Sequence, residues 1–190
     1  MSKLLVIDTE TGGLDPSMNS ILSVGAIVWE DGSLRDSFEV YVLEPNLQID
    51  KKAMEVNRIN LLWLREHGLN PVAAVKQFLD FIGRNFNEYQ STRDKIPIVG
   101  HNVNFDVAFL RRLFRLAGQN YDDVFSHRVL DTAGILRFLT LTGKISISGA
   151  SSTAAFEYFH VDINSSERHT ALADARATGQ LLTKLVALVK

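Results

Sequence analysis

Residues 3–13 read KLLVIDTETGG, and this stretch decides how the fold begins. Its first part, Lys3 to Ile7, is a nearly all-apolar run that ends at polar residues and two glycines, which predicts a short strand buried on both faces. Asp8 and Glu10 follow two positions apart, and alternation along a strand places both side chains on one face. The strand is predicted to present a carboxylate pair, although a loop could place two acidic residues at this spacing by accident.

Two further strands are predicted after this one, over Ile21 to Trp29 and Leu34 to Leu43, joined by a turn at Glu30–Ser33. Together the three strands form an antiparallel meander. Later segments have helical spacing of apolar residues, or short apolar runs bounded by polar residues. The expected helices lie around Ala53 and Leu61, after Pro71, and over 103–117, 133–141 and 170–189, and the expected short strands over 96–100 and 129–130.

Strands first and alternating elements later predict a single α/β domain over residues 1–190, with a mixed sheet flanked by helices. Asp131 and Thr132 are placed to cap the helix that follows them, and Thr170 is placed to cap the last helix. The segment 144–153, rich in serine and glycine, gives no clear prediction.

The composition limits the classes of function. The chain has 190 residues, of which 46% are hydrophobic and 22% charged, and this is typical of a globular domain. It has no cysteine, so disulfides and zinc-thiolate sites are excluded and a reducing cytoplasm is expected. No signal region or membrane span is apparent, so no membrane association is expected. The net charge of −2 gives no general attraction for phosphates, but divalent cations on clustered carboxylates would reverse the local sign.

Two more aspartates lie on the apolar stripes of predicted helices. Apolar residues follow Asp106 by 3, 4, 7, 8 and 11 positions, and apolar residues or Thr178 follow Asp174 by 4, 7, 8, 11 and 15 positions. A buried carboxylate without a partner costs several kcal/mol, so this placement indicates a cation or a hydrogen-bonding partner for each. The alternative is that each aspartate favours the positive end of its helix dipole.

Three motifs in this order resemble the DEDDh 3'-5' exonucleases, a family that includes proofreading subunits, ribonuclease T and oligoribonuclease. The motifs are VIDTETGGL with Asp8 and Glu10, GHNVNFD with Asp106, and HTALAD with His169 and Asp174. The resemblance runs from residue 4 to about 185. It implies a ribonuclease H-like fold and hydrolysis of terminal phosphodiesters of DNA or RNA, which releases nucleoside 5'-monophosphates.

The resemblance also implies a cofactor and a set of catalytic roles. Asp8, Glu10 and Asp174 would hold one Mg²⁺ or Mn²⁺, Asp8 would bridge to a second, and Asp106 would act mainly through a water on the metal. Hard cations of this kind prefer carboxylate oxygen. His169 would take the proton from the attacking water, a role that suits an imidazole near neutral pH.

Residues that would bind the terminal nucleotide follow from the same resemblance. They are Thr11, Gly12, Leu14, Asn57, Asn102 and Phe105. Phe105 can equally be a core aromatic residue, and Asn57 stands where the family often has a histidine. Two other departures from the family are Ser23, where a glutamate is common in the second strand, and the stretch 145–159, which lacks the usual leucine pattern.

Single-stranded nucleic acid, or a 3' end, is the expected partner. A free-standing nuclease is favoured because the chain ends about where the last family helix ends, and a homodimer, as in ribonuclease T, stays open. The alternatives are a proofreading subunit that works bound to a polymerase, and a non-catalytic nucleic-acid-binding module on the same fold. The choice between DNA and RNA is not decided by these motifs.

Overall fold

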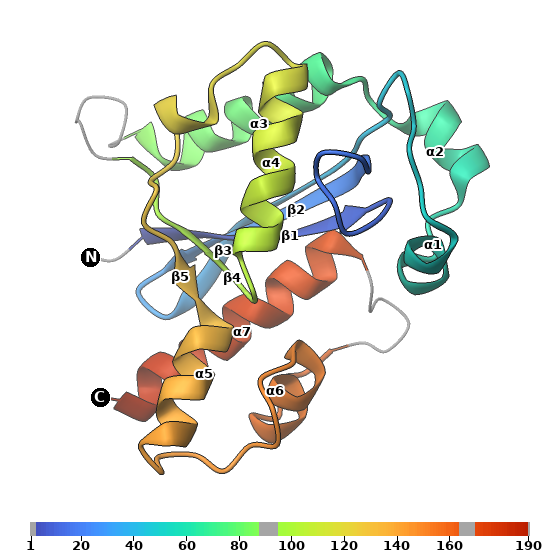
Figure 1. Cartoon of the computed structure of the whole chain (residues 1–190). Helices are drawn as coiled ribbons and strands as arrows, with labels where there is room; N and C mark the ends of the chain where they lie inside the picture. Colours follow the sequence, from blue (N-terminus) through green and yellow to red (C-terminus); the bar gives the residue numbers. More distant parts are fainter. Residues whose placement is uncertain (1–2, 88–94, 164–169, 190) are drawn as a thin grey trace.

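A computed structural model describes residues 3–87, 95–163 and 170–189. A five-stranded sheet with the strand order β3-β2-β1-β4-β5 forms its centre (Figure 1). The strands β1, β2 and β3 pair in antiparallel fashion, whereas β4 and β5 run parallel to β1. The strands are β1 Lys3–Thr11, β2 Ile21–Glu30, β3 Ser33–Tyr41, β4 Ile98–Gly100 and β5 Leu130–Asp131. The predicted mixed α/β sheet with an antiparallel meander is therefore confirmed.

The first strand is longer than the apolar run that predicts it. It continues to Thr11, so Asp8 and Glu10 lie within the paired part of the strand, opposite Gly25 and Ser23 of β2. The predicted turn between β2 and β3 is present, with Asp31 and Gly32 at φ values of 49° and 92°. Positive φ at two successive residues is the geometry of a tight hairpin whose twist matches that of its strands.

Helices cover both faces of the sheet. They are α1 Lys51–Asn57, α2 Leu61–His67, α3 Pro71–Asn85, α4 Asn104–Leu116, α5 Thr132–Leu141, α6 Ser152–Tyr158 and α7 Ala171–Val189, with a 3₁₀ turn at Tyr121–Asp123. Leu5 and Ile7 of β1 belong to the main core, which includes Phe78 of α3 and Phe109 of α4. The other face of β1 is covered by α7, because Val6 lies in a second core cluster with residues of that helix.

The helix boundaries follow from local capping. The hydroxyl of Thr170 accepts from the Ala173 amide at 3.3 Å, and the carboxylate of Asp131 accepts from the Ala133 amide at 3.0 Å, which confirms both as caps. Thr132, in contrast, is buried and donates to the Gly100 carbonyl at 3.1 Å. That bond ties the start of α5 to the end of β4.

The short helix α6 begins at the end of the segment 144–153, which gave no clear prediction. Ser151 caps it by accepting from the Ala154 amide at 3.2 Å. Its buried residues Ala155 and Phe156 pack in a cluster with Leu181 and Leu185 of α7. Residues 152–158 thus form a helix although the stretch 145–159 lacks the leucine pattern that is usual in the family. Within residues 3–87, 95–163 and 170–189, no helix combines the length and the apolar composition needed to cross a membrane.

Candidate active site

Three of the four predicted carboxylates meet between β1 and α7. Asp8, Glu10 and Asp174 each offer one carboxylate oxygen, and these three oxygens lie within 4.8 Å of one another. Asp8 and Glu10 point to the same face because side chains alternate along β1. Asp174 lies in the first turn of α7, which packs on this face of the sheet. Three carboxylate oxygens at this spacing fit a hard divalent cation.

A glycine in β2 allows α7 to approach so closely. An added Cβ at Gly25 would stand 2.2 Å from the carbonyl carbon of Ala171 and 2.3 Å from the Leu172 nitrogen. Gly25 pairs with Asp8 on one side and with Glu39 on the other. The first turn of α7 therefore lies directly on the backbone between these two acidic residues, which brings Asp174 to the face that carries Asp8 and Glu10.

The electrostatics of this cluster favour a bound cation. The pKa of Glu10 is raised to about 8, first by its burial and then by the negative charges of Asp174, Asp106 and Glu39. A carboxyl with such neighbours resists ionisation unless a positive charge is near. A divalent ion at this place would neutralise the cluster and allow Glu10 to act as an ionised ligand.

Asp106 lies outside the group of three ligand oxygens. It is buried on α4, and one of its carboxylate oxygens accepts both the backbone amide of Thr9 at 2.9 Å and the Thr9 hydroxyl at 2.8 Å. Burial raises the pKa of Asp106 to about 7, although these two hydrogen bonds lower it. The charge of Asp106 still acts on Glu10, so the fourth carboxylate lies beside the cluster.

His169 lies outside the described residues. Its neighbour Thr170 and the ligand candidate Glu10 both line one hollow beside the carboxylate cluster.

Of the residues expected to bind the terminal nucleotide, three follow Glu10, with Thr11 at the end of β1 and Gly12 and Leu14 in the loop after it. Thr11 is buried, and its hydroxyl donates to the Gly13 carbonyl at 2.7 Å. The amide of Gly12 donates to the Ser20 carbonyl at 2.7 Å. Leu14, by contrast, is 84% exposed, which leaves its apolar side chain free to contact a ligand.

Asn57 is the last residue of α1 and joins this helix to the end of β1. It is buried, its side chain donates to the Thr11 carbonyl at 3.0 Å, and it accepts from the Ile59 amide at 3.0 Å. Asn102 is exposed with a φ of 60°, and its amide donates to the Asp131 carboxylate at 2.8 Å. Phe105 is partly buried against Phe109, with ring centroids 5.0 Å apart, so it packs as a core aromatic residue.

A hollow of about 250 Å³ beside the cluster includes two aromatic residues, Tyr41 and Trp63, that the sequence does not indicate as site residues. Its lining comprises Glu10, Ser23, Tyr41, Asn57, Arg58, Ile59, Asn60, Trp63 and Thr170. Tyr41 and Trp63 meet edge to face, with ring centroids 4.8 Å apart. The pairing of the meander places Glu10, Ser23 and Tyr41 in one row across the sheet. Tyr41 joins this row only through a register shift between Ile27 and Trp29, so the sequence carries no local signal for it.

The sheet and its helices form a ribonuclease H-like fold whose carboxylate cluster could hold a metal ion, and comparison with known proteins assigns the family. A family model described as Exonuclease, named for ribonuclease T, matches residues 5–182, so the chain belongs to this exonuclease family. The resemblance to the DEDDh exonucleases is thereby confirmed at the level of the family.

Individual relatives agree with this assignment. The chain is 26% identical over 187 residues to a PolC-type DNA polymerase III of Thermotoga petrophila, covering 98% of this chain but 12% of the polymerase. It is 28% identical over 188 residues to ribonuclease T of Wigglesworthia glossinidia brevipalpis, covering 96% of this chain and 83% of that enzyme. The chain thus spans a small part of the polymerase and most of the ribonuclease.

Solved structures share the fold at lower identity. A zinc-bound complex of E. coli exonuclease I with single-stranded DNA has a TM-score of 0.77 at 20% identity, covering 98% of this chain and 41% of that one. Exonuclease X in complex with 5' overhanging duplex DNA has a TM-score of 0.63 at 22% identity, covering 97% of this chain and 91% of that one.

Proposed function

We propose that residues 1–190 form one 3'-5' exonuclease domain that hydrolyses the terminal phosphodiester of a nucleic-acid strand with two divalent cations, Mg²⁺ or Mn²⁺. The observation that carries this proposal is the group of ligand oxygens from Asp8, Glu10 and Asp174 within 4.8 Å. Membership of the exonuclease family supports the class of reaction. The product would be a nucleoside 5'-monophosphate.

Each carboxylate would have its own role in the reaction. Asp8, Glu10 and Asp174 would hold the cations. Asp106, which is bonded to Thr9, would act mainly through a water on the metal. When bound, two divalent ions stabilise both the attacking and the leaving oxygen of a displacement at phosphorus. His169 would take the proton of the attacking water, because an imidazole titrates near neutral pH.

The terminal nucleotide would lie between the hollow and the loop after β1. Glu10 lines the hollow, so a group bound there is next to the proposed metal ligands. Tyr41 and Trp63 would offer aromatic surface to a base or sugar, and Leu14 would offer an exposed apolar contact from the loop after β1. These contacts need no sequence-specific hydrogen bonds, which suits an enzyme that removes successive nucleotides.

Single-stranded ends are the proposed substrate, and exonuclease I, which shares this fold, is seen with single-stranded DNA. We favour an independent enzyme, because the similarity covers 83% of a ribonuclease T. A second candidate is proofreading beside a polymerase, and the similarity to PolC-type polymerases favours that reading. Copurification with a polymerase would distinguish the two.

The decisive test is digestion of end-labelled single- and double-stranded DNA and RNA in Mg²⁺, Mn²⁺ or EDTA. A 3' label should appear first as a mononucleotide, and EDTA should stop the reaction. An Asp8→Asn variant should be inactive, whereas Asp80→Asn, on the exposed face of α3, should act as the wild type. Internal fragments from a circular substrate, or nucleotides removed from the 5' end, would contradict the assignment. Binding without shortening would indicate the non-catalytic module.

A further inference from the structure

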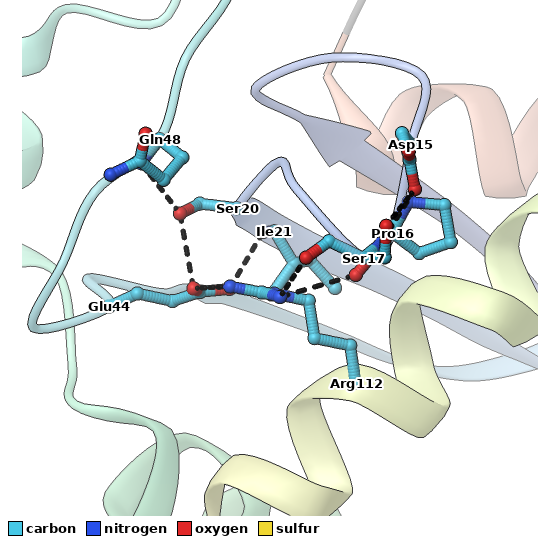
Figure 2. A network of polar contacts seen from close by, with 8 residues as sticks. All are labelled: Asp15, Pro16, Ser17, Ser20, Ile21, Glu44, Gln48 and Arg112. Carbon is cyan, nitrogen blue, oxygen red and sulfur yellow. Dashed lines mark hydrogen bonds and ion pairs between the residues drawn. The ribbon is translucent and has the colours of Figure 1, made fainter.

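A buried ion pair joins α4 to the segment that follows β3 (Figure 2). Glu44 is 3% exposed, and its two carboxylate oxygens accept from Nε and Nη2 of Arg112 at 3.0 and 2.6 Å. The same carboxylate accepts the Ser20 hydroxyl at 3.1 Å and the Ile21 amide at 3.0 Å. Every oxygen of Glu44 is thereby engaged, and the pair spans three parts of the chain.

Arg112 extends from this pair to the loop between β1 and β2. Its Nη1 donates to the Pro16 carbonyl at 3.2 Å and approaches the Ser17 carbonyl at 3.5 Å (Figure 2). The loop is also closed on itself, since the side chain of Asn19 accepts the Asp15 amide at 3.0 Å. Arg112 therefore binds carbonyl groups of a loop that is already compact through its own hydrogen bonds.

The other end of the network reaches the residues next to the carboxylate cluster. The Ser20 hydroxyl accepts from the Gln48 amide at 2.9 Å, and the Ser20 carbonyl accepts from the Gly12 amide at 2.7 Å. Gly12 follows Thr11, whose carbonyl is bound by Asn57. One chain of hydrogen bonds thus links Glu44 to the backbone that leaves Glu10.

Stability is a weak reason to keep such a pair, because the desolvation of two charges offsets much of their attraction. Its effect is geometric: the planar guanidinium fixes a carboxylate and a loop carbonyl at the same time. Leu14, in the same loop, remains exposed to solvent.

We propose that Arg112 and Glu44 are positioning residues that hold the loop 12–20 where Leu14 meets the terminal nucleotide. The proposal rests on the function proposed above. Neither residue touches the reacting atoms, so loss of the pair should weaken substrate binding and leave the chemical step nearly intact. A uniform binding contribution of this kind appears in KM and not in kcat.

A double-mutant cycle tests this coupling. Arg112→Lys keeps the charge but loses the planar fork, and it should raise KM for a single-stranded oligonucleotide by about tenfold with kcat changed less than about twofold. Leu14→Ala should raise KM similarly, and the double variant should be little worse than either single one, because residues that act together are not additive. Fully additive effects, or a loss confined to kcat, would overturn the proposal.

Arg111→Lys is the matched control. Arg111 is the adjacent residue of α4 and binds Asp122 through two hydrogen bonds of 2.7 and 2.6 Å, at the surface and away from the loop. It should leave KM unchanged. If Arg112→Lys does not fold, Glu44→Gln takes its place in the cycle. If neither variant folds, the pair is required for folding and the positioning role is wrong.

A second measurement does not depend on nuclease activity. Hydrogen exchange in EDTA should show the amides of Met18 and Asn19, which are bonded to the Asp15 carbonyl, exchanging about tenfold faster in Arg112→Lys than in Arg111→Lys. Equal exchange in the two variants would overturn the loop's dependence on Arg112. If the wild type shortens no oligonucleotide but the exchange rates differ, the proposed function fails while the positioning of the loop stands.

Discussion

Thr9 donates both its backbone amide and its hydroxyl to one carboxylate oxygen of Asp106, at 2.9 and 2.8 Å. The pairing of β4 with β1 extends only through Leu5 and Val6, so the edge of β1 at Thr9 is met by a side chain of α4 instead of a strand. The residues on either side of Thr9, Asp8 and Glu10, belong to the carboxylate cluster that could hold a metal ion. One strand thus fixes Asp106 relative to the two carboxylates of β1, Asp8 and Glu10.

Replacing Thr9 by valine should destabilise the protein by about 1–3 kcal/mol, because a buried carboxylate loses a hydrogen-bond donor. Thr9→Ser keeps the hydroxyl and should cost less. Urea unfolding of both variants measures the difference. Equal stabilities would mean that the backbone amide alone satisfies Asp106.

Gly25→Ala should displace α7, because the new Cβ would stand 2.2 Å from Ala171. Overpacking of this kind costs about 1–3 kcal/mol, and the shift should also lower Mn²⁺ affinity by moving Asp174. Thermal unfolding and a Mn²⁺ titration check both effects. Gly134→Ala is the control: its Cβ meets only Asp131, at 3.9 Å, and alanine within a helix should be neutral or stabilising. Unchanged metal affinity in Gly25→Ala would show that α7 tolerates the displacement.

Metal-free protein should lose stability as the pH rises from about 4.5 to about 8. The pKa of Glu10 is raised to about 8 and that of Asp106 to about 7, so the folded state keeps protons that the unfolded state releases, and unfolding becomes easier as pH increases. His101, whose pKa is lowered by burial, acts in the opposite direction below its ordinary pKa of 6.5.

Melting curves in EDTA between pH 5 and pH 8.5 measure this dependence. The Glu10→Gln variant keeps the contribution of His101 but lacks that of Glu10, so its melting temperature should fall less across this range. Parallel curves for the two proteins would contradict the raised pKa of Glu10.

Asp174→Asn should abolish nuclease activity yet raise the melting temperature of the metal-free protein, because it removes one negative charge from the cluster. A relief of ~1 kcal/mol corresponds to roughly 2–4 °C in a domain of this size. Mg²⁺ should stabilise the wild type more than the variant, since only the wild type retains the full ligand set. A lower melting temperature for Asp174→Asn in EDTA would assign the aspartate an ordinary structural role.

His169→Ala should lower kcat by ~10² to 10⁴, the usual contribution of a general base, and leave metal binding nearly intact. Asp8→Ala should abolish both. Calorimetric titration with Mg²⁺ separates the two roles. If His169→Ala lost the ion as completely as Asp8→Ala, the histidine would be a ligand.

Short-range periodicity determined much of this protein. Alternation in β1 placed Asp8 and Glu10 on one face, and helical spacing identified Asp106 and Asp174 as inward-facing. The structure brings Asp174 to the pair on β1 and places Asp106 beside this cluster, at the edge of β1, where it is bonded to Thr9. Spacing along a helix reports that a side chain faces the core, but not which layer of the core it meets.

Strand register was decided only by the tertiary structure. Pairing counted from the turn, where Glu30 is opposite Ser33, would put Val40 opposite Ser23. An irregularity between Ile27 and Trp29 shifts the register by one residue, so Tyr41 stands there instead and lines the hollow. A one-residue shift turns a strand's side chains to the opposite face, and no local pattern announces it.

Contacts between segments that are distant in the sequence could not be predicted from it either. The sequence by itself indicated which aspartates face inward, the order of the elements other than α6, and the caps at Asp131 and Thr170, because these depend on neighbours within a few positions. Two contacts depend instead on how whole elements pack. One is the approach of α7 to Gly25, and the other is the ion pair of Arg112 with Glu44, which are 68 positions apart in the sequence. Packing is decided by the shapes of two surfaces together, and a single segment of sequence carries only one of them.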